Sequence, residues 1–188
     1  MNVFYRFNHD KMKQKILIQR YASPCGGLWL GSLGDQLCLC NWTNEKHPGR
    51  VDKRLQTLLK AEYEEAPSDV TQEAIRQLDE YFRRERTSFT IPLLFVGTDF
   101  QQAVWHELLQ IPYGQTLSYG AMAKRLGIPK AVRAVANANG ANAISIFAPC
   151  HRVVGSDGSL TGFGGGIEAK RFLLALEQDK LGCLCRLR

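Results

Sequence analysis

The chain has 188 residues, 45% hydrophobic and 22% charged, with a formal net charge of +6, which suits one large globular domain or two small ones. These values exclude a mainly disordered chain, a collagen-like chain and a small scaffold held together by disulfides. No apolar run approaches the roughly 20 residues of a membrane-spanning helix, and the polar, basic start from Met1 to Arg20 lacks the apolar core of a secretory signal.

Three short strands begin the predicted fold, over 15–21, 28–33 and 36–42. Turn-forming residues separate them, so we expect an antiparallel meander. The Cys38 and Cys40 side chains would point to the same face of the third strand. Core packing explains this pair better than a metal site, because common zinc sites use a C-x-x-C spacing.

Two helices and an extended segment complete the first half. The first helix is predicted over 51–60, and the second starts after Pro67, where Asp69 and Gln72 have the spacing of a capping box. Residues 88–95 have the pattern of an extended segment. The apolar face of the second helix consists of Val70, Ala74, Ile75, Leu78, Tyr81 and Phe82.

The predicted domain boundary lies near Gly97, which gives one domain over 1–96 and another over 97–188. Thr98 and Gln101 form a second capping-box pattern, which predicts the start of a helix. The expected apolar residues of this helix are Phe100, Val104, Leu108 and Leu109, and Ile111-Pro112-Tyr113-Gly114 ends it.

A helix-turn-helix pattern follows. Ser118 can cap a short helix over 119–126, and after a Gly-containing turn a second helix is predicted over 130–139, with Pro129 at its start. The second helix carries mainly small side chains, with Arg133 as its long projecting group. Small side chains suit close approach to a narrow groove, but they suit a helix packed on both faces in the core equally well.

Charge is unevenly distributed along the chain. No acidic residue occurs between Glu107 and Asp157, whereas this stretch holds five bases. A surface that faces phosphates needs such a stretch, because a carboxylate there would repel the nucleic-acid backbone. A chance fluctuation is the alternative explanation. The five bases are Lys124, Arg125, Lys130, Arg133 and Arg152.

Cys150 and His151 are the strongest candidates for chemistry. They follow a predicted extended run over 144–147, and neighbouring side chains on an extended segment point apart, so a water would have to bridge them. His151, oriented by Glu177 of a last helix over 167–177, could then draw the proton from Cys150 and leave a nucleophilic thiolate. The alternative is a buried structural cysteine beside a surface histidine.

Neither a cofactor nor a metal is expected. The Gly-rich segment over 155–166 lacks the following Lys-Ser/Thr of a nucleotide P-loop. His9 and His47 could join N-terminal cysteines around a metal, but their spacing gives no support for such a site. Cys183 and Cys185 form another C-x-C pair, in the tail, to which we assign no role.

Several motifs occur in a fixed order between residues 97 and 177. They are Gly97–Trp105, Ile111–Gly114, Ser118-Tyr119, Lys130–Val135, Asn139–Asn142, Pro149–Val154 (PCHRVV) and Thr161–Gly166. As a set they resemble the O6-alkylguanine-DNA alkyltransferase family. The resemblance implies an α+β fold, with an N-terminal ribonuclease-H-like α/β domain of antiparallel strands. The C-terminal domain would be mostly helical and winged-helix-like, and would contain the helix-turn-helix.

The resemblance also implies roles for the matching residues. Cys150 would accept the alkyl group from guanine O6, His151 would act as a water-mediated base, and Glu177 would align it. Tyr119 would donate to the base as the leaving guanine gains electron density. Arg133 would fill the gap left by the extruded nucleotide.

Further residues would shape the pocket and hold the DNA. Asn142 would brace the turn before the active-site segment, and Phe163 would wall the pocket in place of a frequent tyrosine. The carbonyls of Cys150 and Val153 would receive the guanine amino group, and the Gly164 amide would contact O6. The residues expected to contact DNA are Arg133, Lys130, Ala131, Ala134 and Tyr119.

The implied function is repair of O6-alkylguanine, and of O4-alkylthymine, in duplex DNA, with one turnover per molecule because a thioether does not hydrolyse in water. We expect a cytoplasmic monomer with reduced cysteines and no membrane partner. Two alternatives have weaker support. A DNA-binding regulator would not need Cys150, and a cysteine hydrolase would need an oxyanion hole and usually a distant histidine.

Overall fold

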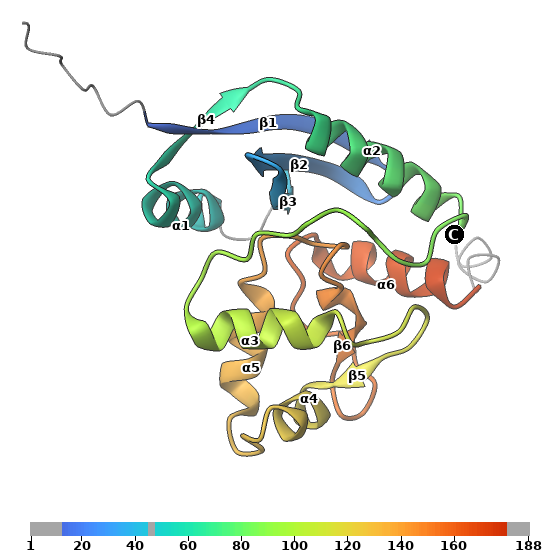
Figure 1. Cartoon of the computed structure of the whole chain (residues 1–188). Helices are drawn as coiled ribbons and strands as arrows, with labels where there is room; N and C mark the ends of the chain where they lie inside the picture. Colours follow the sequence, from blue (N-terminus) through green and yellow to red (C-terminus); the bar gives the residue numbers. More distant parts are fainter. Residues whose placement is uncertain (1–12, 45–47, 180–188) are drawn as a thin grey trace, which may run out of the picture.

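A four-stranded sheet lies at the centre of the first half, with the strand order β3-β2-β1-β4 (Figure 1). The structure is a computed structural model that describes residues 13–44 and 48–179. Strands β1 (Gln14–Ser23), β2 (Gly26–Leu33) and β3 (Gln36–Trp42) pair antiparallel in chain order, which confirms the predicted meander.

The fourth strand, β4 (Ala61–Glu65), is missing from the sequence prediction. It pairs parallel with β1, so the sheet is mixed and not purely antiparallel. Its sequence, Ala-Glu-Tyr-Glu-Glu, has weak strand propensity, and tertiary pairing decides its conformation. Lys13 and Lys15 form ion pairs with Glu62 across the two strands, which offsets the charge at this edge.

Helix α1 (Arg50–Leu59) and helix α2 (Asp69–Phe82) form close to their predicted places, and Figure 1 shows α2 lying along the sheet. The capping box of α2 starts one residue earlier than expected. The Ser68 hydroxyl accepts a hydrogen bond from the Thr71 amide, and the Thr71 hydroxyl accepts one from the Ser68 amide. Ser68 and not Asp69 is the N-cap, because the extended backbone of Ser68 places its hydroxyl over the first helical turn.

The second half is mainly helical. Thr98 and Gln101 form the predicted capping box of the first helix, and Ser118 caps the next one as expected. Phe100 and Leu109 do not belong to the core face, since 37% and 42% of their surfaces are exposed. The elements are α3 (Asp99–Leu108), β5 (Leu117–Ser118), α4 (Tyr119–Arg125), α5 (Val132–Gly140), the 3₁₀ helix η1 (Cys150–Arg152), β6 (Val153–Val154) and α6 (Gly166–Glu177).

Helices α4 and α5 form the predicted helix-turn-helix, but α5 begins at Val132 and not at Lys130. The Ala131 amide donates to the Ile128 carbonyl, so Pro129 occupies the second position of a β-turn, where its fixed φ is favoured, and not the first turn of the helix. The alternative that α5 is buried on both faces in the core is also excluded. Val135 is buried, whereas the face that bears Arg133 is exposed.

The segment predicted to be extended over 144–147 is a turn. Only Ile144 pairs with a strand, through a bridge to Cys40, and the Ala148 amide then donates back to the Ile144 carbonyl. Ile146 is buried with φ +71°, a conformation that costs about 1–3 kcal/mol for a residue other than glycine. The chain is held in this shape directly before the Cys150 segment.

One hydrophobic core crosses from the first half into the second. The outer edge of β3 hydrogen-bonds through Leu37 to the Pro92–Leu94 segment and through Cys40 to Ala143 and Ser145. Cys38 and Cys40 are fully buried in this core, as predicted. The second half contributes Ala143, Ile144, Ile146, Phe147, Ala169, Leu173 and Leu176 to it. Among the described residues no helix is long and apolar enough to cross a membrane.

Candidate active site

Cys150 begins the 3₁₀ helix η1, where the Arg152 amide donates to the Pro149 carbonyl. The sequence analysis predicted an extended segment at Cys150 and His151, and this prediction is wrong. The Cys150 residue is 5% exposed and borders a cavity of about 30 Å³. The lining residues come from both halves of the chain: Asn41, Val51, Asn139, Gly140, Asn142, Ser145, Cys150, Gly162, Phe163 and Gly164. The predicted site residues Cys150, Asn142, Phe163 and Gly164 thus meet at one place.

His151 and Glu177 form a buried pair, with 2.8 Å between His151 Nε2 and Glu177 Oε1. Both side chains are fully buried. His151 Nδ1 is also buried and has no hydrogen-bond partner among the described residues. Because Nε2 is committed to Glu177, Nδ1 is the ring nitrogen that can exchange a proton with a neighbouring group.

Glu177 is held by donors on both carboxylate oxygens. Oε1 accepts from His151 Nε2, from Arg152 Nη2 at 3.0 Å and from the Tyr81 hydroxyl at 2.7 Å. Oε2 accepts from Arg152 Nε at 2.8 Å and from the Gly114 amide at 3.1 Å. Gly114 has φ +75° in a turn closed by Gln115, and a side chain at this position would be strained.

The pKa shifts favour a protonated Cys150 thiol, an uncharged His151 ring and an ionised Glu177 carboxylate. Burial raises the pKa of the Cys150 thiol, although hydrogen bonds to Asn142 and Ser145 oppose the shift. Burial lowers the pKa of His151 against the opposing effect of Glu177. For Glu177, burial acts to raise the pKa, but the hydrogen bonds from His151 and Arg152 hold it well below its usual range. At neutral pH the site therefore holds a protonated thiol and, on the next residue, an uncharged imidazole.

Asn142 lines the Cys150 cavity, whereas Tyr119 is not among its lining residues. Asn142 donates to the Ala148 carbonyl at 2.8 Å and accepts from the Ile144 amide at 3.0 Å, so it spans the turn that leads to Cys150. Tyr119 starts α4, hydrogen-bonds with Thr161 and is half-buried. Burial raises the pKa of Tyr119, which keeps the phenol protonated as a hydrogen-bond donor.

The Gly-rich loop before α6 packs against a tryptophan from the first half. The Trp42 and Phe163 rings meet edge to face at 5.5 Å, and the Phe163 ring lies 6.5 Å from that of His151. A Cβ atom on Gly165 would lie 2.4 Å from Trp42, so only glycine allows this approach. The loop with Phe163 and Gly164 is thereby placed over the Cys150 cavity.

Lys170 is a site residue that the sequence analysis missed. Its side chain is buried, and its ammonium donates to the Val153 carbonyl at 2.6 Å and to the Thr161 carbonyl at 3.0 Å. The Val153 carbonyl keeps a second lone pair for another donor. The signal was present in the sequence, because Lys170 lies three residues after Ile167 and three before Leu173, on the apolar face of α6.

Lys170→Met is expected to loosen the loop and to raise the pKa of Cys150. The Lys170 ammonium lowers the pKa of Cys150, so its removal should raise that pKa. The two carbonyl groups that it holds would lose charge-assisted hydrogen bonds worth roughly 1.5–3 kcal/mol each. Part of this loss is offset because a buried ammonium no longer has to be desolvated. The pH dependence of Cys150 alkylation by iodoacetamide should move to higher pH. Arg171→Met, on the exposed face of α6, is the control and should leave that dependence unchanged.

The predicted DNA-contacting residues lie on the helix-turn-helix and not in the Cys150 cavity. Lys130, Arg133 and Ala134 are exposed, and Ala131 is half-buried. The two surfaces are connected through Asn139 at the end of α5, whose amide donates to the Cys150 carbonyl at 3.4 Å. Arg133 lies six residues earlier on the same helix, about 9 Å along its axis.

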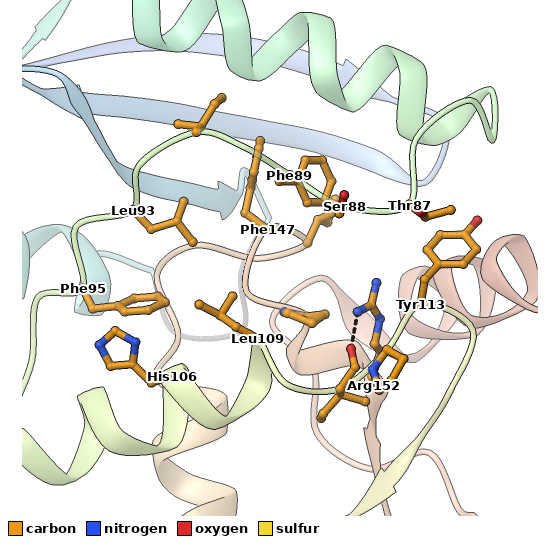
Figure 2. Close-up of a pocket in the computed structure, with 15 residues that line it drawn as sticks. Thr87, Ser88, Phe89, Leu93, Phe95, His106, Leu109, Tyr113, Phe147 and Arg152 are labelled. Carbon is orange, nitrogen blue, oxygen red and sulfur yellow. Dashed lines mark hydrogen bonds between the residues drawn. The ribbon is translucent and has the colours of Figure 1, made fainter.

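A larger cavity, of about 490 Å³, lies elsewhere between the two halves of the chain (Figure 2). Phe89, Phe95 and Leu109 line it, and Arg152 borders it with its Nη1 atom donating to the Ile111 carbonyl at 2.6 Å. Neither Cys150 nor His151 is among its lining residues. Its size therefore gives no support to a reaction in this cavity.

No group of three or more His, Cys, Asp or Glu side chains that could hold a metal occurs within 13–44 and 48–179. His9, His47, Cys183 and Cys185 lie outside the described residues. The side chains gathered around Cys150 supply a thiol, an imidazole and several hydrogen-bond donors. This set is suited to nucleophilic attack by sulfur with proton transfer to a buried base.

Comparisons with known proteins cover both halves of the chain. Residues 16–95 match the sequence profile described as 6-O-methylguanine DNA methyltransferase, ribonuclease-like domain, and residues 99–179 match the DNA binding domain of the same name. The methylated-DNA--protein-cysteine methyltransferase of Haemophilus influenzae is 44% identical over 159 residues, which is 84% of either chain. That of Mycobacterium bovis is 56% identical over 107 residues, covering 57% of this chain and 65% of the relative's length.

Solved structures show the same architecture. The crystal structure of Mycobacterium tuberculosis OGT in complex with DNA has a TM-score of 0.74 and 41% identity, covering 87% of this chain and 93% of that one. The O6-methylguanine-DNA methyltransferase of Pyrococcus kodakaraensis has a TM-score of 0.61 and 27% identity, covering 86% and 98%. The expected α+β fold is confirmed by this likeness.

Proposed function

Because the chain belongs to the 6-O-methylguanine DNA methyltransferase family, we propose that it repairs O6-alkylguanine in duplex DNA by moving the alkyl group to its own Cys150. One observation carries the proposal: Cys150 is buried and precedes His151, whose Nε2 is bound by Glu177 and whose Nδ1 has no partner within the described part of the chain. A buried thiol next to an oriented, neutral base is what direct displacement by sulfur requires.

The proposed reaction is one displacement. The Cys150 sulfur attacks the alkyl carbon, and a carbon–sulfur bond forms as the carbon–O6 bond breaks. The thiol proton passes through a water to His151 Nδ1, and Glu177 supports the charge on the ring. The electron pair of the broken bond stays on guanine, which takes a proton from Tyr119. Tyr119 then regains a proton from water and His151 releases the one it took, so the thiol proton is replaced overall by one on guanine. The product is a stable thioether, so each molecule acts once.

The base must leave the helix stack to reach Cys150, because O6 of a stacked guanine is closed to in-line attack. The cavity beside Cys150 is lined in part by Gly162, Phe163 and Gly164, which would contact the flipped base when it enters. We propose that α5 lies in the minor groove, where its small exposed side chains permit close contact. The acid-free surface of the helix-turn-helix would hold the phosphates.

The test is a mass measurement on intact protein. Reduced protein is incubated with duplex DNA that contains one O6-methylguanine, and the expected product carries one added methyl group on the peptide with Cys150. A parallel duplex with O4-methylthymine tests the second expected substrate. Folded, reduced protein that binds this DNA but gains no methyl group would contradict the proposal.

We further propose that the protein acts as a monomer in the cytoplasm, where its cysteines stay reduced.

Arg133→Ala is expected to lower repair in duplex DNA by about 10- to 100-fold, because the gap left by a flipped base would lack its filling side chain. Arg133 is exposed on α5 and makes no contact with the Cys150 cavity. The reaction with the free base O6-methylguanine should therefore keep its rate. Equal losses in the duplex and free-base assays would argue against this role.

A further inference from the structure

Tyr81 belongs to α2 in the first half of the chain, yet its hydroxyl reaches Glu177 on α6. The Oη–Oε1 distance is 2.7 Å, and the tyrosine is 1% exposed. Figure 1 shows α2 and α6 near each other, and the Phe82 and Phe172 rings of the two helices lie 6.5 Å apart. The contact is thus part of a packed interface between the two halves.

Tyr81 and His151 donate to the same oxygen, Oε1 of Glu177. We infer that Tyr81 is a positioning residue for the His151–Glu177 pair, supplied to the active site by the ribonuclease-like half. The inference rests on the proposed function, in which His151 takes the Cys150 proton. It also gives the first half of the chain a part in the chemistry beyond mechanical support.

Tyr81 acts on the Glu177 carboxylate as an uncharged hydrogen-bond donor. Burial raises the pKa of its phenol well above the ordinary value, and Glu177 raises it further, so the hydroxyl stays a donor at any working pH. A donor on Oε1 draws charge density away from the oxygen that stabilises a protonated His151. Tyr81 therefore fixes the carboxylate in place and also keeps His151 less basic.

The other charged and titratable groups around the pair stay unchanged when the hydroxyl is removed. His151 is faced by Glu177 and Lys170 from α6 and by Arg152 from its own segment. Tyr81 is faced in addition by Tyr113, whose ring lies 6.1 Å away. Arg152 holds Glu177 through its own hydrogen bonds, so the carboxylate remains ionised in Tyr81→Phe.

The chain offers a matched control for this substitution. Tyr21 on β1 donates to Asp79 on α2 at 2.7 Å, the same type of hydrogen bond at the same distance. Tyr21→Phe removes a tyrosine–carboxylate contact of α2 without touching Glu177. A purely structural role for the Tyr81 hydroxyl would make the two variants behave alike.

The experiment measures the second-order rate of methyl transfer to Cys150 as a function of pH in wild type, Tyr81→Phe and Tyr21→Phe. The rate rises with pH as His151 loses its proton, and loss of the Tyr81 donor should raise the pKa of His151. We expect the acid limb of Tyr81→Phe to move to higher pH by about 0.5–1 unit. At neutral pH the rate should fall roughly 3- to 10-fold, because the base is less well placed. Tyr21→Phe should reproduce the wild-type profile.

A second substitution acts in the opposite direction. Site-specific 3-fluorotyrosine at position 81 keeps the ring and strengthens the donor, so the acid limb should move to lower pH. Superimposable profiles for wild type, Tyr81→Phe and the fluorinated protein would overturn the inference while leaving the proposed function intact. Equal shifts in Tyr81→Phe and Tyr21→Phe would also overturn it. Failure of the wild-type protein to accept a methyl group would instead refute the proposed function.

Discussion

Cys150→Ser is expected to abolish methyl transfer, with a loss of roughly 10⁴-fold or more. The hydroxyl can keep the hydrogen bonds to Asn142 and Ser145, so the site should stay folded. A serine hydroxyl beside a neutral imidazole is a far weaker nucleophile toward an alkyl carbon than a thiol. Binding to duplex DNA should be kept, since the exposed face of α5 is untouched.

Intact mass after incubation with methylated duplex is the measurement, and a gel-shift titration follows DNA binding. Cys25→Ala is the control, because Cys25 is a half-buried free thiol outside the Cys150 cavity. This control should accept one methyl group like the wild type. Methyl transfer that persists in Cys150→Ser would place the acceptor elsewhere in the chain.

Glu177→Gln is expected to lower the free energy of unfolding by about 3 kcal/mol and the transfer rate by about 10²-fold or more. Arg152 is buried and would lose its counter-charge. A glutamine amide would also place N–H groups opposite some of the five donors that now converge on the carboxylate. His151 would then lack both its orientation and the negative charge that supports its protonation.

Urea unfolding at several pH values measures the stability effect. The folded-state pKa of Glu177 is depressed, so its stabilisation is complete above its unfolded pKa of about 4.3 and is lost as pH falls through the folded value. The difference between wild type and variant should therefore be largest at neutral pH and shrink below about pH 4. Glu168→Gln, an exposed position on α6, should change stability by less than about 0.5 kcal/mol. A pH-independent difference would contradict the assignment.

Local sequence patterns were sufficient to predict most elements and to single out Cys150 as the candidate nucleophile. The meander strands, the helix caps at Thr98 and Ser118 and the helix-turn-helix depend on spacings of two to four residues. Cys150 and His151 are neighbours in the chain, and Glu177 was predicted from its place on a helix near them. These features could be predicted because short-range spacing determines which side chains share a turn, a strand face or a helix face.

Long-range pairing explains what the sequence did not reveal. The Tyr81 and Glu177 residues are 96 positions apart, and no periodicity within either helix indicates that their side chains meet. Strand β4 has weak propensity and is specified by its pairing with β1. The contact between Trp42 and Gly165 also joins distant parts of the chain, so no local pattern predicts it.

The sequence by itself therefore determined the family, most of the helices and strands, and Cys150 as the candidate acceptor. The tertiary structure decided which side chains surround Cys150 and how the His151–Glu177 pair is held. Packing of α2 and β3 onto the second half brings Tyr81 to the Glu177 carboxylate and Trp42 to the Gly-rich loop. These contacts form only when the shared core buries both halves together, because a hydrogen bond between distant residues needs the whole fold to hold its two groups at bonding distance.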